Sequence, residues 1–149
     1  MKATAPGKII LSGEYAVLFG RPALMFAIDR HVETSINSGG VSGFQILLEA
    51  FNSHTATMLV ELVRTKRRIT ARYRRYVQGD CDIRTVIRHP VELVEYALAK
   101  ILELTKSALT CGLEVKIKSN LPVGYGFGSS AASIISLIGA LNAYLKLRC

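Results

Sequence analysis

One stretch near the C-terminal end of the chain decides the fold, and it reads Leu121-Pro122-Val123-Gly124-Tyr125-Gly126-Phe127-Gly128-Ser129-Ser130-Ala131-Ala132. Three glycines occupy every second position, and two serines and an apolar run follow them. Upstream, Leu113 to Lys118 alternates apolar and charged residues, which predicts a half-buried strand. Downstream, about Ser130 to Leu147 is apolar at most positions and predicts a helix buried on most of its sides. The predicted order is therefore strand, glycine loop, helix.

That order is typical of phosphate-binding sites. The start of a helix offers unpaired backbone N–H groups and a partial positive charge. Glycines allow a close backbone approach and positive φ angles, and serine hydroxyls can reach a phosphate oxygen or a magnesium ion. From the residues alone, a tight turn that needs flexible residues is the alternative. The loop has neither the Gly-Lys-Ser/Thr of a Walker motif nor the third glycine of the dinucleotide fingerprint, because Ser130 and Ala131 follow.

The rest of the chain mixes strand and helix patterns without a linker, so we expect a single α+β domain spanning residues 1–149. The turn signal Ser38-Gly39-Gly40 suggests that the strand after it pairs back on the strand before it as a hairpin. The further strands are expected at Lys8–Leu11, Ala23–Ile28, Val32–Asn37 and Phe44–Leu48. The further helices are expected at about Thr55–Tyr76, with Leu59, Leu62, Val63 and Tyr73 on one side, and at Pro90–Thr105.

The composition favours a globular protein in a reducing compartment. Half of the 149 residues are hydrophobic and a fifth are charged. No apolar run has the length of a membrane span, and the first residues lack the apolar segment of a signal peptide. Three cysteines without CxxC spacing (Cys81, Cys111 and Cys149) support neither a disulfide framework nor a zinc site. We therefore expect a cytoplasmic protein without a membrane partner.

The net charge of +8 is concentrated in one segment. Between Arg64 and Arg88 there are nine basic residues and two aspartates, so this segment carries all but one of the net positive charges. A solvated helix face is one explanation. A surface for nucleic acid or an acidic membrane is the second, with Tyr73 and Tyr76 placed between arginines as stacking groups.

Two motifs resemble the signatures of the GHMP kinases. Pro122–Ala132 resembles the second signature, Pro-x-Gly-x-Gly-Leu-Gly-Ser-Ser-Ala, with Phe127 in place of leucine. Ala5–Leu18 resembles the first signature in its mevalonate-pathway form. The resemblance covers the whole chain. It implies an α+β fold with a left-handed βαβ unit, which is the fold of the GHMP-kinase N-terminal domain, here truncated. This fold belongs to the class named after the second domain of a small-subunit ribosomal protein.

The resemblance also implies roles for individual residues. Lys8 is expected to lie beside the transferred phosphoryl group as the catalytic cation, and Glu14 and Tyr15 are expected to face the acceptor substrate. Ser130 matches the usual magnesium ligand. The nucleotide phosphates are assigned to Gly124, Gly126, Gly128, Ser129, Ser130 and Ala131. The implied cofactors are ATP and Mg²⁺.

The implied activity is phosphorylation of mevalonate. Gly13-Glu14-Tyr15-Ala16-Val17-Leu18 is closer to phosphomevalonate kinases, whereas Phe19-Gly20-Arg21-Pro22-Ala23-Leu24 is closer to mevalonate kinases, so phosphomevalonate is the alternative acceptor. The sequence also leaves open an inactive nucleotide-binding fragment and a basic nucleic-acid-binding module, although no nucleic-acid partner is expected.

A further departure concerns the catalytic carboxylates. The family places an aspartate and a magnesium-binding glutamate after the glycine loop, but no acidic residue follows Glu114. The sequence therefore resembles the N-terminal half of a kinase, and this chain alone is expected to be inactive. The apolar final helix is expected to be covered by another part of the chain or by a second copy in a homodimer.

Overall fold

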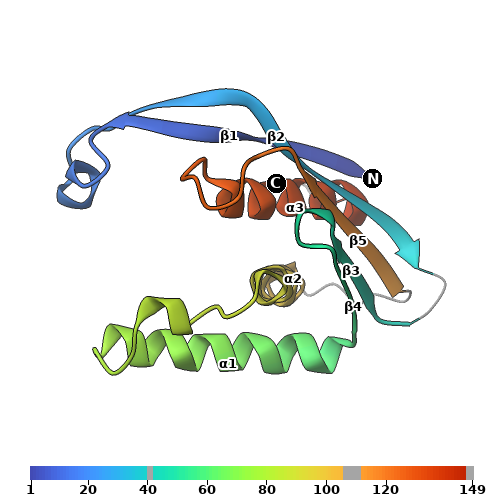
Figure 1. Ribbon diagram of the computed structural model, residues 1–149. Helices are drawn as coiled ribbons and strands as arrows, with labels where there is room; N and C mark the ends of the chain where they lie inside the picture. The colour runs from blue at the N-terminus through green and yellow to red at the C-terminus, as the bar shows by residue number, and fades with distance from the viewer. Residues whose placement is uncertain (40–41, 106–111, 147–149) are drawn as a thin grey trace.

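The computed structural model describes residues 1–39, 42–105 and 112–146, and it confirms the α+β class (Figure 1). The strands are β1 (Lys2–Ser12), β2 (Leu24–Gly39), β3 (Phe44–Leu48), β4 (Ser53–Thr57) and β5 (Gly112–Ser119). The helices are α1 (Leu59–Val77), α2 (Pro90–Thr105) and α3 (Ser129–Leu145), with short 3-10 turns η1 (Ala16–Phe19), η2 (Glu49–Phe51) and η3 (Ile83–Thr85). Cys111, Cys149 and Leu147 lie outside the described residues.

The five strands form one sheet in the order β1-β2-β5-β3-β4. The pair β3 and β5 is parallel, and the other neighbouring pairs are antiparallel. The prediction that β3 pairs back on the preceding strand was therefore wrong, because β5 lies between them. All eight residues of β5 pair with β2, from Val32 opposite Ser119 to Gly39 opposite Gly112, whereas β3 has only five residues. The longer strand, β5, occupies the centre of the sheet.

The first long helix begins later than predicted. Residues 53–57 form β4 against β3, and α1 starts at Leu59. Two β-branched threonines in this short stretch suit a strand better than a helix. The predicted apolar side was also partly wrong, because Leu59 and Tyr73 are each 53% exposed, whereas Leu62, Thr65 and Ile69 are buried. The buried side of α1 is partly polar because it packs on α2, which presents charged residues there.

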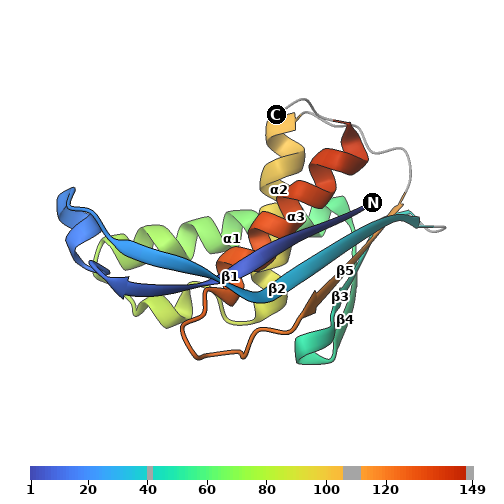
Figure 2. The same cartoon turned by 90° about the horizontal axis from the view of Figure 1, so that it is seen from above.

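The domain is layered (Figures 1 and 2). Helix α3 packs on β1 and β2, α2 lies beside it, and α1 forms an outer layer against α2. A buried hydrogen bond of 2.7 Å joins Thr34 Oγ1 on β2 to Ser136 Oγ on α3. The core takes residues from the sheet and all three helices, including Val32, Ile36, Ile46, Leu62, Leu98, Val115, Leu137 and Leu141. No helix in the described part of the chain is both long and apolar enough to cross a membrane.

The face of α3 away from the sheet remains partly open. Ile135 is 60% exposed and Ile138 is 44% exposed. The prediction that this helix is buried on most sides was thus wrong for this domain. The positions predicted for α2 and β5 are confirmed to within a few residues.

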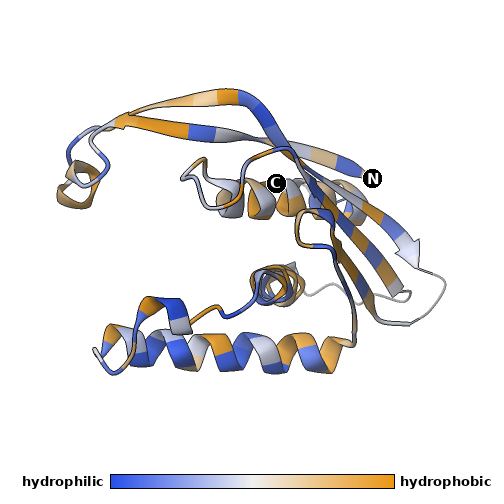
Figure 3. Ribbon diagram, viewed as in Figure 1, coloured by the Kyte–Doolittle hydropathy of each residue, from blue (hydrophilic) through white to orange (hydrophobic). Residues whose placement is uncertain are grey.

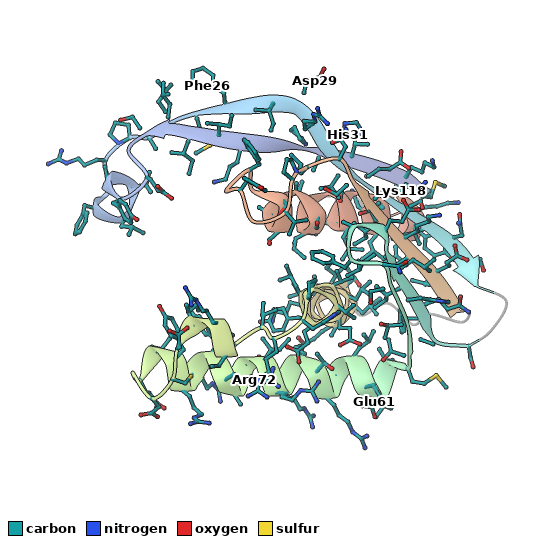
Figure 4. The ribbon with its side chains drawn as sticks, viewed as in Figure 1. Phe26, Asp29, His31, Glu61, Arg72 and Lys118 are labelled. Carbon is teal, nitrogen blue, oxygen red and sulfur yellow. The ribbon has the colours of Figure 1, made fainter. Side chains whose placement is uncertain are left out.

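Beyond α3, β1 and β2 continue as a two-stranded arm with η1 at its end (Figures 1 and 2). Apolar residues are frequent along this arm, as Figure 3 shows. Phe26, Asp29 and His31 point outward from β2, away from the helices (Figure 4). The exposed apolar residues of the arm and its tip are Ile9, Leu11, Tyr15, Val17, Leu18, Phe19, Leu24, Met25 and Phe26.

Candidate nucleotide site

A cavity of about 770 Å³ lies between the glycine loop and the segment that leads into α2. Its volume falls in the range of small-molecule sites, about 300–1,000 Å³. No aspartate or glutamate belongs to its lining in the described part of the chain. One side is polar and small: Ser119, Gly124, Gly126, Gly128, Ser129, Ser130 and Ser133. The segments around η2 and before α2 contribute mostly apolar residues: Leu48, Ala50, Phe51, Ile87, Arg88, His89, Pro90, Leu93 and Val94. Ile117 on β5 and Val123 in the loop also line the cavity.

The glycine loop adopts a backbone that needs glycine. Gly124, Gly126 and Gly128 have φ angles of 85°, 78° and 72°, in the left-handed region that other residues rarely adopt. A Cβ atom added at Gly124 or Gly126 would meet no other atom within 4 Å. Packing therefore does not explain these two glycines. Their left-handed backbone conformation explains them, and the missing side chains leave open space in front of the loop.

The start of α3 has no side-chain cap. Its N-cap residue is Gly128, which has no side chain to offer, and the first helical hydrogen bond runs from the Ala132 N–H to the Gly128 carbonyl at 2.9 Å. The N–H groups of Ser129, Ser130 and Ala131 precede that bond and have no acceptor within the helix. Ser130 and Ala131 are exposed. The first turn therefore has three N–H groups without an acceptor in the helix, and two of them belong to Ser129 and Ser130, which line the cavity.

The start of α2, at the same cavity, is closed by side chains. His89 Nδ1 accepts a hydrogen bond from the Val91 N–H at 3.3 Å, and Glu92 Oε2 accepts one from the Arg88 N–H at 2.9 Å. The Arg72 guanidinium from α1 binds both oxygens of Glu92 at 3.0 and 3.1 Å. Burial alone would raise the pKa of Glu92, but the Arg88 N–H and Arg72 together hold it below the ordinary value.

Lys8 is brought to the glycine loop by two contacts. Its backbone N–H donates to the Phe127 carbonyl at 3.0 Å. A Cβ atom added at Gly128 would lie 2.9 Å from Lys8 Cγ, so the side-chain stem of Lys8 runs past the start of α3. Gly7 is also required for this approach, because an added Cβ there would collide with Leu121. Two motifs about a hundred residues apart in sequence thus meet.

Glu14 and Tyr15 lie elsewhere. They form the turn before η1, at the end of the β1–β2 arm, and both are exposed. Figures 1 and 2 show the glycine loop nearer the body of the domain. Among the described residues, no hydrogen bond or ion pair joins either side chain to the loop. Their predicted role toward the acceptor remains a prediction.

The basic segment is partly used within the fold. Lys66 pairs with Glu103 at 2.8 Å, Arg68 lies 3.8 Å from Glu92, and Arg72, labelled in Figure 4, binds Glu92. These pairs join α1 to α2. Beside them, burial raises the pKa of Glu95. The segment also contains Arg88, which with His89 lines the cavity. Sequence reasoning missed both residues, although Pro90 and Glu92 directly after them signal a helix start.

Metal-binding side chains are sparse in this domain. The described residues include no group of three or more His, Cys, Asp or Glu side chains that could hold an ion. Cys81 is a free thiol that donates a hydrogen bond to the Arg72 carbonyl. A magnesium ion here would need oxygen atoms from a bound ligand in addition to Ser130.

Comparisons with known proteins agree with this geometry. The family model described as the GHMP kinases N terminal domain matches residues 92–149, which include most of α2, β5, the glycine loop and α3. The chain is 34% identical over 147 residues to a mevalonate kinase of Pyrococcus abyssi, covering 97% of this chain and 39% of that protein. The chain thus spans about two fifths of the length of its curated relatives.

Solved structures share the fold. The mevalonate kinase of Methanococcus jannaschii superposes with a TM-score of 0.76 at 22% identity, over 100% of this chain and 41% of that one. The phosphomevalonate kinase of Streptococcus pneumoniae, in complex with phosphomevalonate and AMPPNP, gives a TM-score of 0.59 at 18% identity, over 100% and 38%. At these identities the likeness establishes the fold.

Proposed function

Because the chain belongs to the GHMP kinase superfamily, we propose that the whole protein transfers a phosphoryl group from ATP to mevalonate. One observation carries the proposal. A single cavity combines an uncapped helix start and three left-handed glycines with an apolar wall and a lining free of carboxylates in the described residues. Such a cavity suits a ligand that is anionic at one end and flat and apolar at the other, as a nucleotide is.

The phosphates would lie on the glycine side. The N–H groups of Ser129, Ser130 and Ala131 would donate to phosphate oxygens, and the turned backbone at Gly124 and Gly126 leaves room for them. The base would lie on the apolar wall, where Phe51 and Ile87 are 44% and 37% exposed. These partly exposed side chains gain buried area when a flat ring covers them.

Lys8 and Ser130 would serve the reaction itself. Lys8 lies beside Gly128, where a fixed cation can stabilise the negative charge that develops during transfer. Ser130 is an exposed residue in the first turn of α3, and its hydroxyl would bind the cation. When bound, ATP supplies the phosphoryl group and Mg²⁺ neutralises part of its charge. Glu14 and Tyr15 would contact the acceptor.

The acceptor assignment rests on the relatives. Curated mevalonate kinases from several archaea match nearly the whole of this chain, including the first signature. A coupled assay of the whole protein with ATP and Mg²⁺ should therefore show turnover of mevalonate when mevalonate, phosphomevalonate, homoserine and galactose are offered separately. Turnover of phosphomevalonate alone would show that phosphomevalonate, and not mevalonate, is the acceptor. Turnover of galactose alone would refute the proposal.

A further inference from the structure

The cavity has a cationic residue on the wall opposite the glycine loop. Of its lining residues in the described chain, only Arg88 is permanently charged. The neighbouring His89 accepts a hydrogen bond at Nδ1 from the Val91 N–H, so that nitrogen carries no proton. Arg88 is exposed, and none of the ion pairs formed by the described residues includes its guanidinium. This cation is therefore available to a ligand.

The position of Arg88 is fixed through its backbone. Its N–H donates to Glu92, which Arg72 and Arg68 hold from α1. The Arg72 and Glu92 side chains are only 17% and 14% exposed, so this support is partly shielded from water. Arg68 and Arg72 thus hold the Glu92 carboxylate in place. This carboxylate in turn fixes the backbone of the turn that carries Arg88. An anchored turn loses little conformational freedom when its side chain binds.

A polyphosphate needs more positive charge than the glycine loop supplies. Backbone N–H groups bring partial charges, and Lys8 brings one full charge from the side of β1. We propose that Arg88 binds the polyphosphate chain of the nucleotide from the α2 side, so that the phosphates are held between two walls. A guanidinium suits this task because it donates two parallel hydrogen bonds to phosphate oxygens. The inference rests on the proposed nucleotide function.

A series of nucleotides that differ in phosphate number tests this inference. Binding of ATP, ADP, AMP and adenosine to the whole protein and to Arg88→Gln should be measured by calorimetry at fixed salt. We expect the variant to lose affinity for ATP and ADP by about tenfold or more, the cost of one charge-assisted contact. Its affinity for adenosine should stay within about twofold of the parent's. Arg88→Lys should recover part of the loss, because the charge returns without the paired geometry.

Arg84→Gln is the matched control, since Arg84 is an exposed arginine four residues away that does not line the cavity. It should bind every nucleotide as the parent does. Equal ATP binding by the parent and Arg88→Gln would overturn the inference, as would an equal loss for ATP and adenosine, which would indicate a packing role. If the parent itself binds no nucleotide, the proposed function fails instead.

Discussion

Two helices begin at the same cavity, and their first turns differ. At α2, His89 and Glu92 accept N–H groups, and Glu92 is itself held by arginines from α1. At α3, the N-cap is a left-handed glycine, and no side chain accepts the first N–H groups. Buried or crowded N–H groups are rarely left without acceptors. The α2 start is therefore closed by side chains, whereas the N–H groups at the exposed α3 start are open to a ligand.

The largest effect should follow from a substitution in the loop before α3. Gly126→Val places a side chain where φ is 78° and where the phosphates would lie. Loss of two charge-assisted hydrogen bonds predicts a drop in ATP affinity on the order of 10²–10⁴. Backbone strain at this positive φ should also lower the melting temperature, although an added Cβ meets no other atom within 4 Å.

Gly79→Val provides a matched control for backbone strain. Gly79 has a φ of 83°, also has no atom within 4 Å of an added Cβ, and lies outside the cavity lining. Both variants should show similar thermal unfolding, and only Gly126→Val should lose nucleotide binding. Equal ATP binding by the two would show that the loop does not hold phosphates.

The second effect concerns Lys8. In Lys8→Met the stem that packs beside Gly128 is retained and the charge is removed. We expect kcat of the whole protein to fall about 10²–10³-fold, the usual loss for one group that stabilises transition-state charge. Lys2→Met, a change in the same strand whose lysine pairs with Glu33, should leave kcat unchanged. A normal kcat for Lys8→Met would show that the charge of Lys8 has no role in the reaction.

The third effect is on stability, at the closed helix start. Glu92→Gln removes the charge that holds Arg72, and we expect the free energy of unfolding to fall by about 1–3 kcal/mol at neutral pH. Because the pKa of Glu92 is lowered in the folded state, its charge stabilises the fold above the ordinary value of 4.5. The difference between parent and variant should therefore shrink as the pH falls through the folded pKa.

Denaturant unfolding across this pH range measures the effect. Glu103→Gln is the control, because Glu103 also pairs with α1, through Lys66, but its side chain is 52% exposed. Its substitution should cost less stability than that of Glu92. A larger cost for Glu103 would mean that the Glu92 pairs do not anchor the α2 start.

The smallest effect should come from the buried contact under α3. Thr34→Val removes the partner of Ser136, whose hydroxyl can still donate to the Ser133 carbonyl at 3.1 Å. We expect a loss of about 0.5–1.5 kcal/mol in unfolding free energy with no change in ATP affinity. Thr4→Val on the exposed side of β1 should be close to neutral. A large loss of ATP affinity in Thr34→Val would mean that the packing of α3 on β2, and not the open first turn of α3, determines ATP binding.

Sequence reasoning found both helix starts but missed the side chains that close the start of α2. Glycine spacing is a local signal, so the strand, loop and helix around residues 113–145 could be predicted from neighbouring residues. At the first turn of α2, Glu92 accepts the Arg88 N–H and is held by Arg72, which lies 20 residues before it in sequence. A contact of this kind requires the packing of α1 on α2, which no local pattern encodes.

The sheet order was missed for the same reason. A turn signal after β2 suggested a hairpin with β3, but β2 pairs with β1 and with β5, and β5 follows two helices. The meeting of Lys8 with the glycine loop was expected from the family resemblance alone. The structure adds its cause, which is the absence of side chains at Gly7 and Gly128.

One measurement tests most directly whether the ligand completes the α3 start. The backbone amide resonances of the protein can be followed while a non-hydrolysable ATP analogue is titrated with Mg²⁺ present. We expect the largest shifts at Gly126, Gly128, Ser129, Ser130 and Ala131, and small ones at Val91 and Glu92, whose N–H groups already have acceptors. Saturating binding with the largest shifts at the α2 start, and unchanged resonances at Ser129 to Ala131, would contradict a ligand-completed α3 start.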